Sequence, residues 1–358
     1  MRSKPLRAVI VAIALYSFLV SIQLLGVSLK LFGVGFSHQL IRTTQNPFVG
    51  LFIGILVTSL VQSSSVTTSI VVGFVAAQVL GISNAIPIVM GANIGTTVTN
   101  TLVSLGHITR KVEFSRAFPA AIVHDFFNLL SVLIFFPLEI NFHIIEKSSL
   151  ILAEAFKGIG GLTITSPLKV MTSPLAHLIA KVLGSNPIIV MPLSLILLFI
   201  SLKFLVDILR TLVSKRVELT LDKYLFGTPV KSLLFGFLLT AVIQSSSVAT
   251  SLMVPLVGAG LLTLRKVYPY TLGTNIGTTL TAIFASLATG TLLGIQIAFC
   301  HLLFNIFGII VWYPLRILPI TLAEKLGGVI TQKRFFALIY IGLIFYLIPI
   351  IFIILTRR

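Results

Sequence analysis

The feature that most constrains this sequence is a duplicated polar motif in apolar surroundings. Gln62-Ser63-Ser64-Ser65 recurs as Gln244-Ser245-Ser246-Ser247, an offset of 182 residues. At the same offset, Asn93-Ile94-Gly95-Thr96-Thr97 recurs as Asn275-Ile276-Gly277-Thr278-Thr279. Of the 59 positions from Pro47 to Leu105, 26 are identical to their counterparts, far more than two unrelated apolar segments would share. The chain is therefore expected to fold as two related halves.

Composition places these halves in a membrane. Hydrophobic residues make up 56% of the chain and charged residues 10%, with a mean hydropathy of +1.10, which predicts a multispanning membrane protein. The formal net charge is +17, but the basic residues lie mostly in loops and at the chain ends, as membrane topology requires. A nucleic-acid partner is therefore not expected. The single cysteine, Cys300, excludes an internal disulfide framework.

The polar motifs are informative because of this apolar setting. Hydroxyls, amides and glycines at membrane depth are tolerated only where they face protein or a water-filled cavity. Two such breaks at corresponding positions of two halves point to the substrate site of a transporter. The alternative is that the serines and threonines only let helices pack closely.

Hydropathy and loop signals predict an all-α polytopic protein. The first half is expected to hold a span over 8–26, an interfacial stretch over 27–46, hairpin arms over 47–61 and 66–80, a segment over 83–105 broken at Gly91 and Gly95, and a span over 117–138. The second half is expected to hold a span over 188–213, a hairpin over 229–262, a broken segment over 266–287, a span over 295–313 and an amphipathic connector over 314–334. We therefore divide the chain into repeat 1 (1–138), an amphipathic connector (139–186), repeat 2 (187–334) and a C-terminal span (335–358).

The hairpin arms are too short for full crossings. Each is roughly 22 Å long at about 1.5 Å per residue, against a hydrocarbon core of about 30 Å. Re-entrant hairpins, with tips near the bilayer midplane, fit this length.

Charge asymmetry predicts that the two halves are inverted. Basic residues follow the first broken segment (Arg110, Lys111) but precede the second (Arg265, Lys266), and basic loops mark the cytoplasmic side. The N-terminus is expected to be cytoplasmic. The side of the membrane on which the C-terminus lies stays open. The number of crossings places it outside, whereas the two terminal arginines favour the inside.

Taken together, the motifs resemble those of the type II sodium–phosphate cotransporter family. The resemblance rests on the paired Gln-Ser-Ser-Ser and Gly-x-Asn-Ile-Gly-Thr-Thr motifs. It extends to Val123-His124-Asp125-Phe126-Phe127-Asn128 and Cys300-His301-Leu302-Leu303-Phe304-Asn305. The resemblance covers about residues 47–130 and 229–310. Within the family, the chain looks like a minimal prokaryotic member.

The resemblance implies that both motifs line one site for phosphate and sodium. The implied phosphate-binding residues are Gln62, Ser63, Ser64, Ser65, Gln244, Ser245, Ser246 and Ser247. The implied sodium-binding residues are Gln62, Ser65, Thr68, Ser69, Asn93, Thr96, Thr97, Gln244, Ser247, Thr250, Ser251, Asn275, Thr278 and Thr279. The implied function is sodium-dependent symport of inorganic phosphate across the cell membrane, and a phosphate exporter or a carrier of another small oxyanion is the alternative.

The residues themselves lead to compatible chemistry. No Asp or Glu occurs before Glu113 or between Asp222 and Glu324, so both polar cores are expected to lack carboxylates. Calcium and magnesium sites use several carboxylate oxygens, whereas neutral hydroxyl, amide and carbonyl oxygens suit sodium. Exposed helix N-termini suit an oxyanion. No cofactor and no transition metal are expected, and the partners are membrane lipid, phosphate and sodium, with a homo-oligomer left open.

Other readings of the polar residues remain open. His124 and Asp125 lie in a predicted span, where ionisable residues are either functional or buried polar contacts that hold the bundle. An intramembrane serine hydrolase could use Ser64 or Ser246 but needs a base within reach, so no enzyme is expected. A channel could also be built from polar hairpin tips.

Overall fold

The computed structural model describes residues 4–32, 44–159, 167–212 and 227–356. Every regular element in these ranges is helical, as the sequence predicts. The elements of the first half are α1 (Lys4–Leu31), α3 (Pro47–Val61), α4 (Ser64–Ala76), α5 (Ile82–Gly95), α6 (Val98–Ser104), the 3-10 turn η1 (Leu105–His107), α7 (Lys111–Phe142), α8 (Ile144–Ile159) and α9 (Pro167–Val182).

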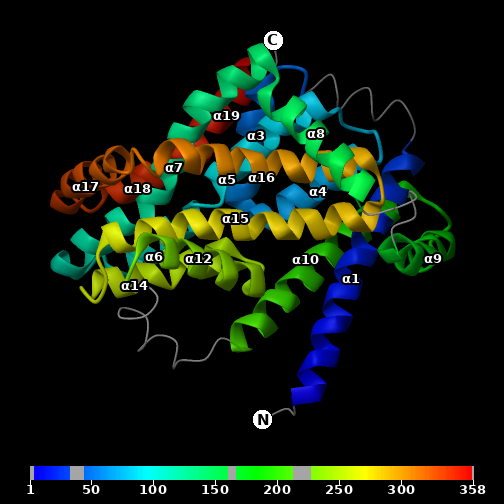
Figure 1. Cartoon of the computed structure of the whole chain (residues 1–358), viewed down its shortest axis with the longest axis horizontal. Helices are drawn as coiled ribbons and strands as arrows, with labels where there is room; N and C mark the ends of the chain where they lie inside the picture. Colours follow the sequence, from blue (N-terminus) through cyan, green and yellow to red (C-terminus); the bar gives the residue numbers. More distant parts are fainter. Residues whose placement is uncertain (1–3, 33–43, 160–166, 213–226, 357–358) are drawn as a thin grey trace.

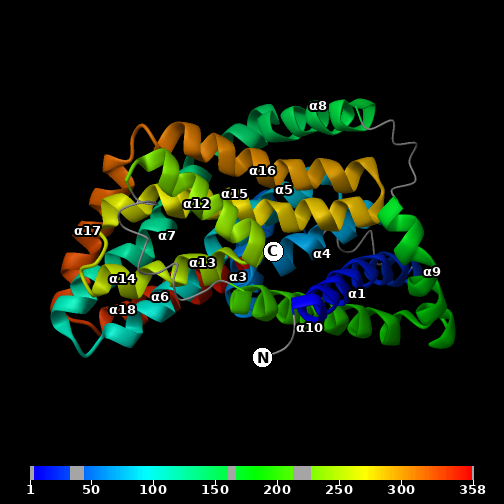
Figure 2. The same ribbon diagram turned by 60° about the horizontal axis from the view of Figure 1, so that its bottom comes forward.

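The first seven described elements of the second half follow a similar order, and three further elements come after them. The elements of this half are α10 (Pro187–Leu212), α12 (Pro229–Ile243), α13 (Ser246–Ser251), α14 (Met253–Gly258), α15 (Leu264–Thr289), α16 (Leu292–Trp312), α17 (Ile317–Gln332), α18 (Phe336–Ile341), the π-helical turn η3 (Gly342–Leu347) and α19 (Ile348–Thr356). Figure 1 shows α15 and α16 side by side through the middle of the molecule, and Figure 2 shows α8 along α16 and α1 beside α10.

Four helical stretches of the described chain are long and apolar enough to cross a membrane. They are Val9–Leu31, Lys111–Phe142, Leu292–Trp312 and Phe336–Thr356. The arms of both hairpins are shorter apolar helices, in keeping with the sequence argument. The chain is therefore a multi-pass, all-α membrane protein.

Each hairpin packs against the segment that follows it through glycines that lie at equivalent positions. A Cβ atom on Gly54 of α3 would overlap the carbonyl group of Ile88 in α5, and one on Gly91 would overlap that of Leu51. Gly236 and Gly273 make the same crossing between α12 and α15. The duplicated glycines thus bring each hairpin backbone into direct contact with its neighbour.

The two hairpins approach the centre from opposite ends of α7. At the base of the first, the Phe48 ring lies 5.0 Å from that of Phe136, near the end of α7. At the base of the second, Gly258 lies against Glu113, near the start of α7. Because α7 has 32 residues, it is about 48 Å long.

The core does not separate into one part for each half. One apolar cluster contains Val72 and Ile94 from the first half together with Ala285 and Phe304 from the second. Another combines residues of α7 with residues of α12, α15 and α17. The two halves are therefore interlocked by shared packing.

The expected breaks at Gly91 and in the second segment are wrong, whereas α5 ends at Gly95, the other expected break. In the first half the helix continues through Gly91 and is interrupted only at Thr96 and Thr97, where the Thr97 amide bonds the carbonyl three residues earlier. In the second half α15 is continuous. Leu280 and Ala282 occupy the positions of Val98 and Asn100, and both have higher helix propensity.

Other boundaries shift outward from their predicted places. α1 extends to Leu31 and so includes the start of the stretch expected at the interface, whereas residues 33–43 lie outside the described chain. The middle connector forms two helices, α8 and α9. Residues 357–358 are also outside the described chain, so the two arginines do not decide the side of the C-terminus.

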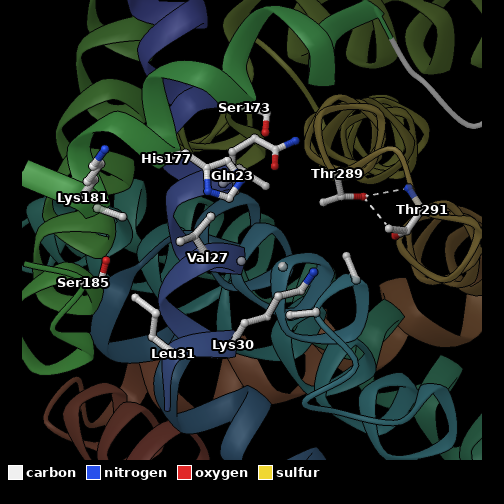
Figure 3. Close-up of a pocket in the computed structure, with 16 residues that line it drawn as sticks. Gln23, Val27, Lys30, Leu31, Ser173, His177, Lys181, Ser185, Thr289 and Thr291 are labelled. Atoms are coloured by element: carbon white, nitrogen blue, oxygen red, sulfur yellow. Dashed lines mark hydrogen bonds between the residues drawn. The ribbon is translucent and has the colours of Figure 1, made fainter. Parts of the chain in front are cut away.

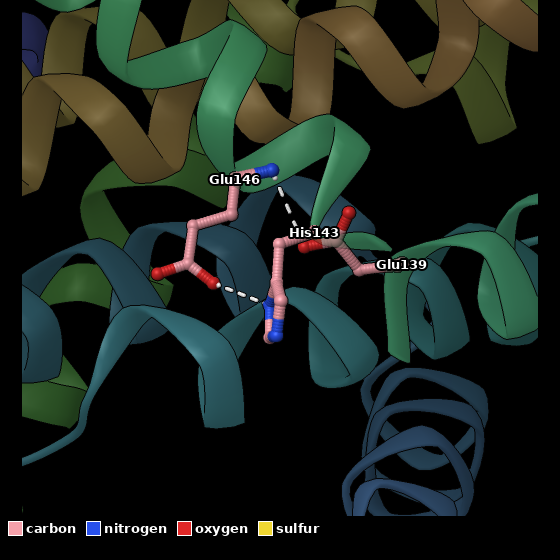
Figure 4. Close-up of side chains that lie close together, drawn as sticks. All are labelled: Glu139, His143 and Glu146. Atoms are coloured by element: carbon pink, nitrogen blue, oxygen red, sulfur yellow. Dashed lines mark hydrogen bonds and ion pairs between the residues drawn. The ribbon is translucent and has the colours of Figure 1, made fainter. Parts of the chain in front are cut away.

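The corner between α7 and α8 is closed by polar side chains (Figure 4). The Glu139 carboxylate accepts from the amides of Ile145 (2.6 Å) and Glu146 (3.2 Å) at the start of α8. Ser83 of α5 donates to Glu146 (2.9 Å), whose carboxylate also lies 3.1 Å from His143 Nδ1. Glu139, His143 and Glu146 bring potential metal ligands within 4.8 Å of one another. The Glu139 oxygens already cap a helix, which accounts for their position.

Candidate functional site

Each Gln-Ser-Ser-Ser motif forms the tip of its hairpin. Gln62 ends α3 in the left-handed conformation (φ 57°), and its backbone N–H donates to the Thr58 carbonyl at 2.7 Å. Ser63 begins the next helix, because its hydroxyl accepts from the Val66 amide at 3.3 Å. The second tip repeats this geometry, with φ 59° at Gln244. Left-handed backbone is uncommon for a residue with a side chain, so its occurrence at both glutamines marks the tips as equivalent.

The structure brings the two tips together. The Ser65 hydroxyl donates to the Gln244 carbonyl at 3.4 Å, and the Ser247 hydroxyl donates to the Gln62 carbonyl at 3.4 Å. Ser65 and Ser247 are equivalent, as are Gln62 and Gln244, so the two bonds exchange partners across an approximate two-fold axis. Ser247 also lies 3.0 Å from the Thr96 hydroxyl. The motifs predicted from the sequence to share a site therefore touch directly.

The tip residues differ in exposure. Buried side chains are Ser64, Ser65, Gln244, Ser246 and Ser247. Ser63 and Ser245 are half-buried, and Gln62 is exposed. Gln244 is only 6% exposed, so the two tips are alike in backbone and different in side-chain environment.

Two asparagines are each contacted by a histidine from the opposite half. His124 Nε2 lies 2.6 Å from Asn275 Oδ1, and His301 Nε2 lies 3.3 Å from Asn93 Oδ1. Asn128 adds a bond to the Asn93 carbonyl at 2.6 Å. His124 is therefore a buried polar contact that joins the two halves, as one of the two sequence readings expects. The signal for both histidines is the repeated His-x-x-x-Asn pattern in the sequence.

Most of the predicted threonines bond to the backbone of their own helices. The hydroxyl of Thr68 donates to the carbonyl of Ser64 (2.7 Å), that of Thr97 to Ile94 (2.7 Å), that of Thr278 to Thr274 (3.0 Å) and that of Thr279 to Ile276 (2.7 Å). A hydroxyl that donates in this way keeps lone pairs that can accept a bond or bind a cation. The Ser69 hydroxyl is buried and has no hydrogen-bond partner among the described residues.

Two further residues hold the second tip and were not singled out from the sequence. Thr281 donates to Gln244 Oε1 at 2.8 Å. Asn100 Oδ1 lies 2.7 Å from the Thr250 hydroxyl and accepts from Ser251 at 3.2 Å. Thr281 could have been found, because its counterpart Thr99 is also threonine. Asn100 could not, because the duplication places Ala282 at its counterpart.

The expectation that both polar cores lack carboxylates is wrong. Asp125 of α7 is fully buried, and its Oδ2 lies 3.5 Å from the Thr101 hydroxyl and accepts from the Tyr340 hydroxyl at 2.8 Å. Its Oδ1 has no hydrogen-bond partner among the described residues. Asp125 lies outside the duplicated segments in the sequence, but the fold brings α7 against α6. A carboxyl oxygen is thus available beside neutral hydroxyl groups.

The fold and the joined tips define a multi-pass, all-α membrane protein with a duplicated polar hairpin at its centre. A family model described as Na+/Pi-cotransporter matches residues 17–164 and 197–348. These ranges include both tips and leave out α9, almost all of α19 and parts of α1 and α10. The chain belongs to this family.

Individual relatives agree with the family. The chain is 34% identical over 435 residues to sodium-dependent phosphate transport protein 2B of Homo sapiens, and the alignment covers 94% of the chain and 63% of that protein. It is 35% identical over 417 residues to sodium-dependent phosphate transport protein 2A of Ovis aries, with 94% and 65% covered. The chain thus spans less than two thirds of the length of these two relatives. No solved structure matches the chain significantly.

Proposed function

We propose that this chain is a secondary active transporter that carries inorganic phosphate across the cell membrane together with sodium ions. The observation that supports it most strongly is the pair of reciprocal bonds between Ser65 and Gln244 and between Ser247 and Gln62. They join two helix–tip–helix hairpins from two related halves, which is the arrangement that carriers use for a central site. The names of the relatives, both sodium-dependent phosphate transport proteins, supply the substrate.

The proposed phosphate site is the set of eight tip residues. A phosphate placed at the tips would meet hydroxyl donors and acceptors of the serines and the positive N-terminal end of α4, which begins at Ser64. Phosphate carries O–H groups at neutral pH, and serine hydroxyls and glutamine amides can accept from them. We therefore retain the serines and glutamines of both tips as the phosphate ligands.

The proposed sodium sites use the oxygens around the tips. Gln244 Oε1 and the hydroxyls of Thr278 and Thr281 supply neutral oxygens beside the second tip, and Asp125 supplies carboxyl oxygens beside Thr101 of α6. A sodium ion beside the phosphate lowers the cost of placing its charge in an apolar environment. This mutual effect is a physical reason for coupled transport.

The orientation that we propose follows from charge. Basic residues near the start of α15 and before α7 mark the cytoplasmic side, so the N-terminus is cytoplasmic and the hairpins are re-entrant from opposite faces. Repeat 1 (1–138) and repeat 2 (187–334) are then inverted copies joined by the connector (139–186).

The alternatives gain less support. The described hydrogen bonds join neither the Ser64 nor the Ser246 hydroxyl to a histidine or lysine, and the two buried histidines contact asparagines instead. A serine hydrolase would need such a base. A channel requires no coupling between two ions, so the dependence of phosphate flux on a sodium gradient separates it from a symporter.

Uptake of labelled phosphate into proteoliposomes tests the function. We expect accumulation with an inward sodium gradient and little when choline replaces sodium. Gln62→Ala and Gln244→Ala should each lower uptake by about tenfold or more, because one lost bond to a charged ligand is worth roughly 1.5–3 kcal/mol. Gln332→Ala, at an exposed position at the end of α17, is the matched control. Uptake that ignores sodium and follows a pH step would contradict the proposal.

A further inference from the structure

A cavity whose lining includes none of the tip residues lies elsewhere in the molecule. It has a volume of about 540 Å³ and is bounded by α1, α4, α9 and the turn between α15 and α16 (Figure 3). Small and apolar residues, including Gly26, Val27, Gly73 and Ala76, form much of its wall. Cavities of this size hold small molecules or parts of larger ones.

Three basic side chains line this cavity. They are Lys30 of α1 and His177 and Lys181 of α9, and all three are exposed. The described residues of the lining include no aspartate or glutamate. The ion pairs found in the described chain involve none of the three. The cavity therefore has a positive potential that no carboxylate of its lining offsets.

The lysines also lie at helix ends. Lys30 is in the last turn of α1 and Lys181 in the last turn of α9, where a cation offsets the negative end of the helix dipole. That role explains each lysine separately. It does not explain why both, together with His177, face one cavity.

The far wall adds groups that suit an anion. Thr291 begins α16, a helix of 21 residues, and its hydroxyl accepts from the Gly294 amide at 3.1 Å. The positive end of this helix therefore borders the cavity. Figure 3 shows the Lys30 side chain extending toward the turn that carries Thr289 and Thr291. A phosphate group between them would meet a cation on one side and a helix N-terminus on the other.

We propose that this cavity binds a phosphate group, carried by the headgroup of an anionic phospholipid. Basic pockets between membrane helices are suited to such headgroups, and the apolar wall formed by α1 and α4 suits an attached acyl chain. Free inorganic phosphate has the same headgroup chemistry but would leave the apolar wall uncovered. The bound lipid joins α1 and α9 to the last turn of α4, the helix that begins at the first tip. The proposal requires only that the protein is inserted in a membrane. Its test is therefore independent of the transport function.

Lysine footprinting of the intact protein in lipid nanodiscs tests this site. The modification rates of Lys30 and Lys181 by an amine-reactive reagent are measured by mass spectrometry, with the exposed Lys147 of α8 as control. The lipid is phosphatidylcholine alone, phosphatidylcholine with phosphatidylglycerol, or phosphatidylcholine with inorganic phosphate in the buffer. We expect phosphatidylglycerol to slow modification of Lys30 by about fivefold relative to Lys147, which corresponds to about 1 kcal/mol per basic residue.

Each outcome decides the source of the phosphate group. Protection by phosphatidylglycerol but not by inorganic phosphate supports the lipid site. Equal protection by inorganic phosphate assigns the same site to the free anion. Equal slowing at Lys30 and Lys147, or no slowing at either, overturns the proposal, because a general surface potential would act on both.

A pair of variants provides an independent readout. The double variant Lys30→Gln/Lys181→Gln should lose the increase in thermal midpoint that phosphatidylglycerol gives the unmodified protein, while Lys147→Gln keeps it. A double variant that is stabilised as much as the unmodified protein contradicts the proposal. If the double variant does not fold, the footprint of the unmodified protein still decides.

Discussion

At the residue scale, the two halves differ in which buried hydroxyl groups have a hydrogen-bond partner. Thr281 donates to Gln244 Oε1 at 2.8 Å, whereas the hydroxyl of its counterpart Thr99 is buried without a partner among the described residues. Likewise, Thr58 donates to Thr67 at 2.9 Å, while the equivalent Thr240 hydroxyl has none. The second difference has a simple cause, because Ala249 replaces Thr67 in the second half.

This difference predicts opposite results for one substitution at two equivalent positions. Thr281→Val removes the donor to Gln244 and leaves a buried amide oxygen unpaired, which costs about 1–3 kcal/mol. Thr99→Val replaces an unpaired buried hydroxyl with a methyl group of similar size and should be neutral or slightly stabilising. Thermal midpoints in detergent measure both. Equal destabilisation by the two variants would show that Thr99 has a partner that the static structure lacks.

At the element scale, the backbones of the hairpins could be predicted and their surroundings could not. The first arm begins and ends as expected, at Pro47 and Val61, because Asn46 caps it, Pro47 suits the first turn and the polar tip ends it. In the next segment the helix ends at Gly95, as expected, but it continues through Gly91, because glycine alone does not break a helix that packs through that glycine. The contact of Asp125 with Thr101 depends on how α7 meets α6, which no local pattern records. The pairing of Asn100 with Thr250 likewise joins the two halves.

Close backbone packing at the hairpin crossings predicts intolerance of even one methyl group. Gly273→Ala would place a Cβ atom on the Leu233 carbonyl group, so α12 and α15 must separate or the variant must fail to fold. We expect a loss of more than about 3 kcal/mol, in the range of severe overpacking. Gly328→Ala is the matched control, because Gly328 lies in the helix α17, is exposed and has open space around it. There alanine should stabilise by roughly 0.5–1 kcal/mol. Size-exclusion profiles and melting curves compare the two variants, and similar behaviour would refute the packing argument.

The helices that follow the two tips are anchored unequally. Beyond the reciprocal tip bonds, α13 is held by Asn100, which contacts Thr250 and Ser251, and by the Tyr270 hydroxyl, which donates to the Ala249 carbonyl at 2.8 Å. The equivalent helix α4 has one such bond, from Thr58 to Thr67, and its Ser69 hydroxyl has no partner among the described residues. The helix after the first tip therefore has fewer bonds to hold it in place.

Hydrogen exchange should detect this inequality. Amides at the start of α4 should exchange about thirtyfold faster than those at the start of α13, because two additional bonds of about 1 kcal/mol each oppose local opening of α13. Asn100→Ala gives the first half the alanine that the second half carries at position 282, and it should raise exchange in α13 toward the rate of α4. Exchange that is equal in the unmodified protein, or unchanged by Asn100→Ala, would mean that these bonds do not limit opening.

At the scale of the whole molecule, two hydrogen bonds to Glu146 show which helix ends lie at the same end of the bundle. Ser83, at the start of α5, donates to Glu146 at 2.9 Å, and Gln296, near the start of α16, donates to the Glu146 carbonyl at 3.3 Å. The end of α15 adjoins the start of α16, so it lies at this end too. Because α15 has 26 residues, its start lies about 39 Å away. Equivalent helix starts, α5 and α15, are therefore at opposite ends of the molecule.

Thiol labelling tests whether these ends face opposite sides of the membrane. Ser83 and Arg265 occupy equivalent positions at an offset of 182 residues, and both are exposed. In a Cys300→Ser background, which removes the single, buried cysteine, each is replaced by cysteine in turn. An impermeant thiol reagent added to intact cells should label the cysteine at position 83, which lies away from the basic loops. It should reach position 265 only after the membrane is opened, because Arg265 and Lys266 are the kind of residues that remain on the cytoplasmic side. Folded, inserted protein is confirmed for both variants by gel filtration. If both positions are labelled from the same side, the halves are not inverted in the membrane, and the two tips cannot be the ends of hairpins that enter from opposite faces.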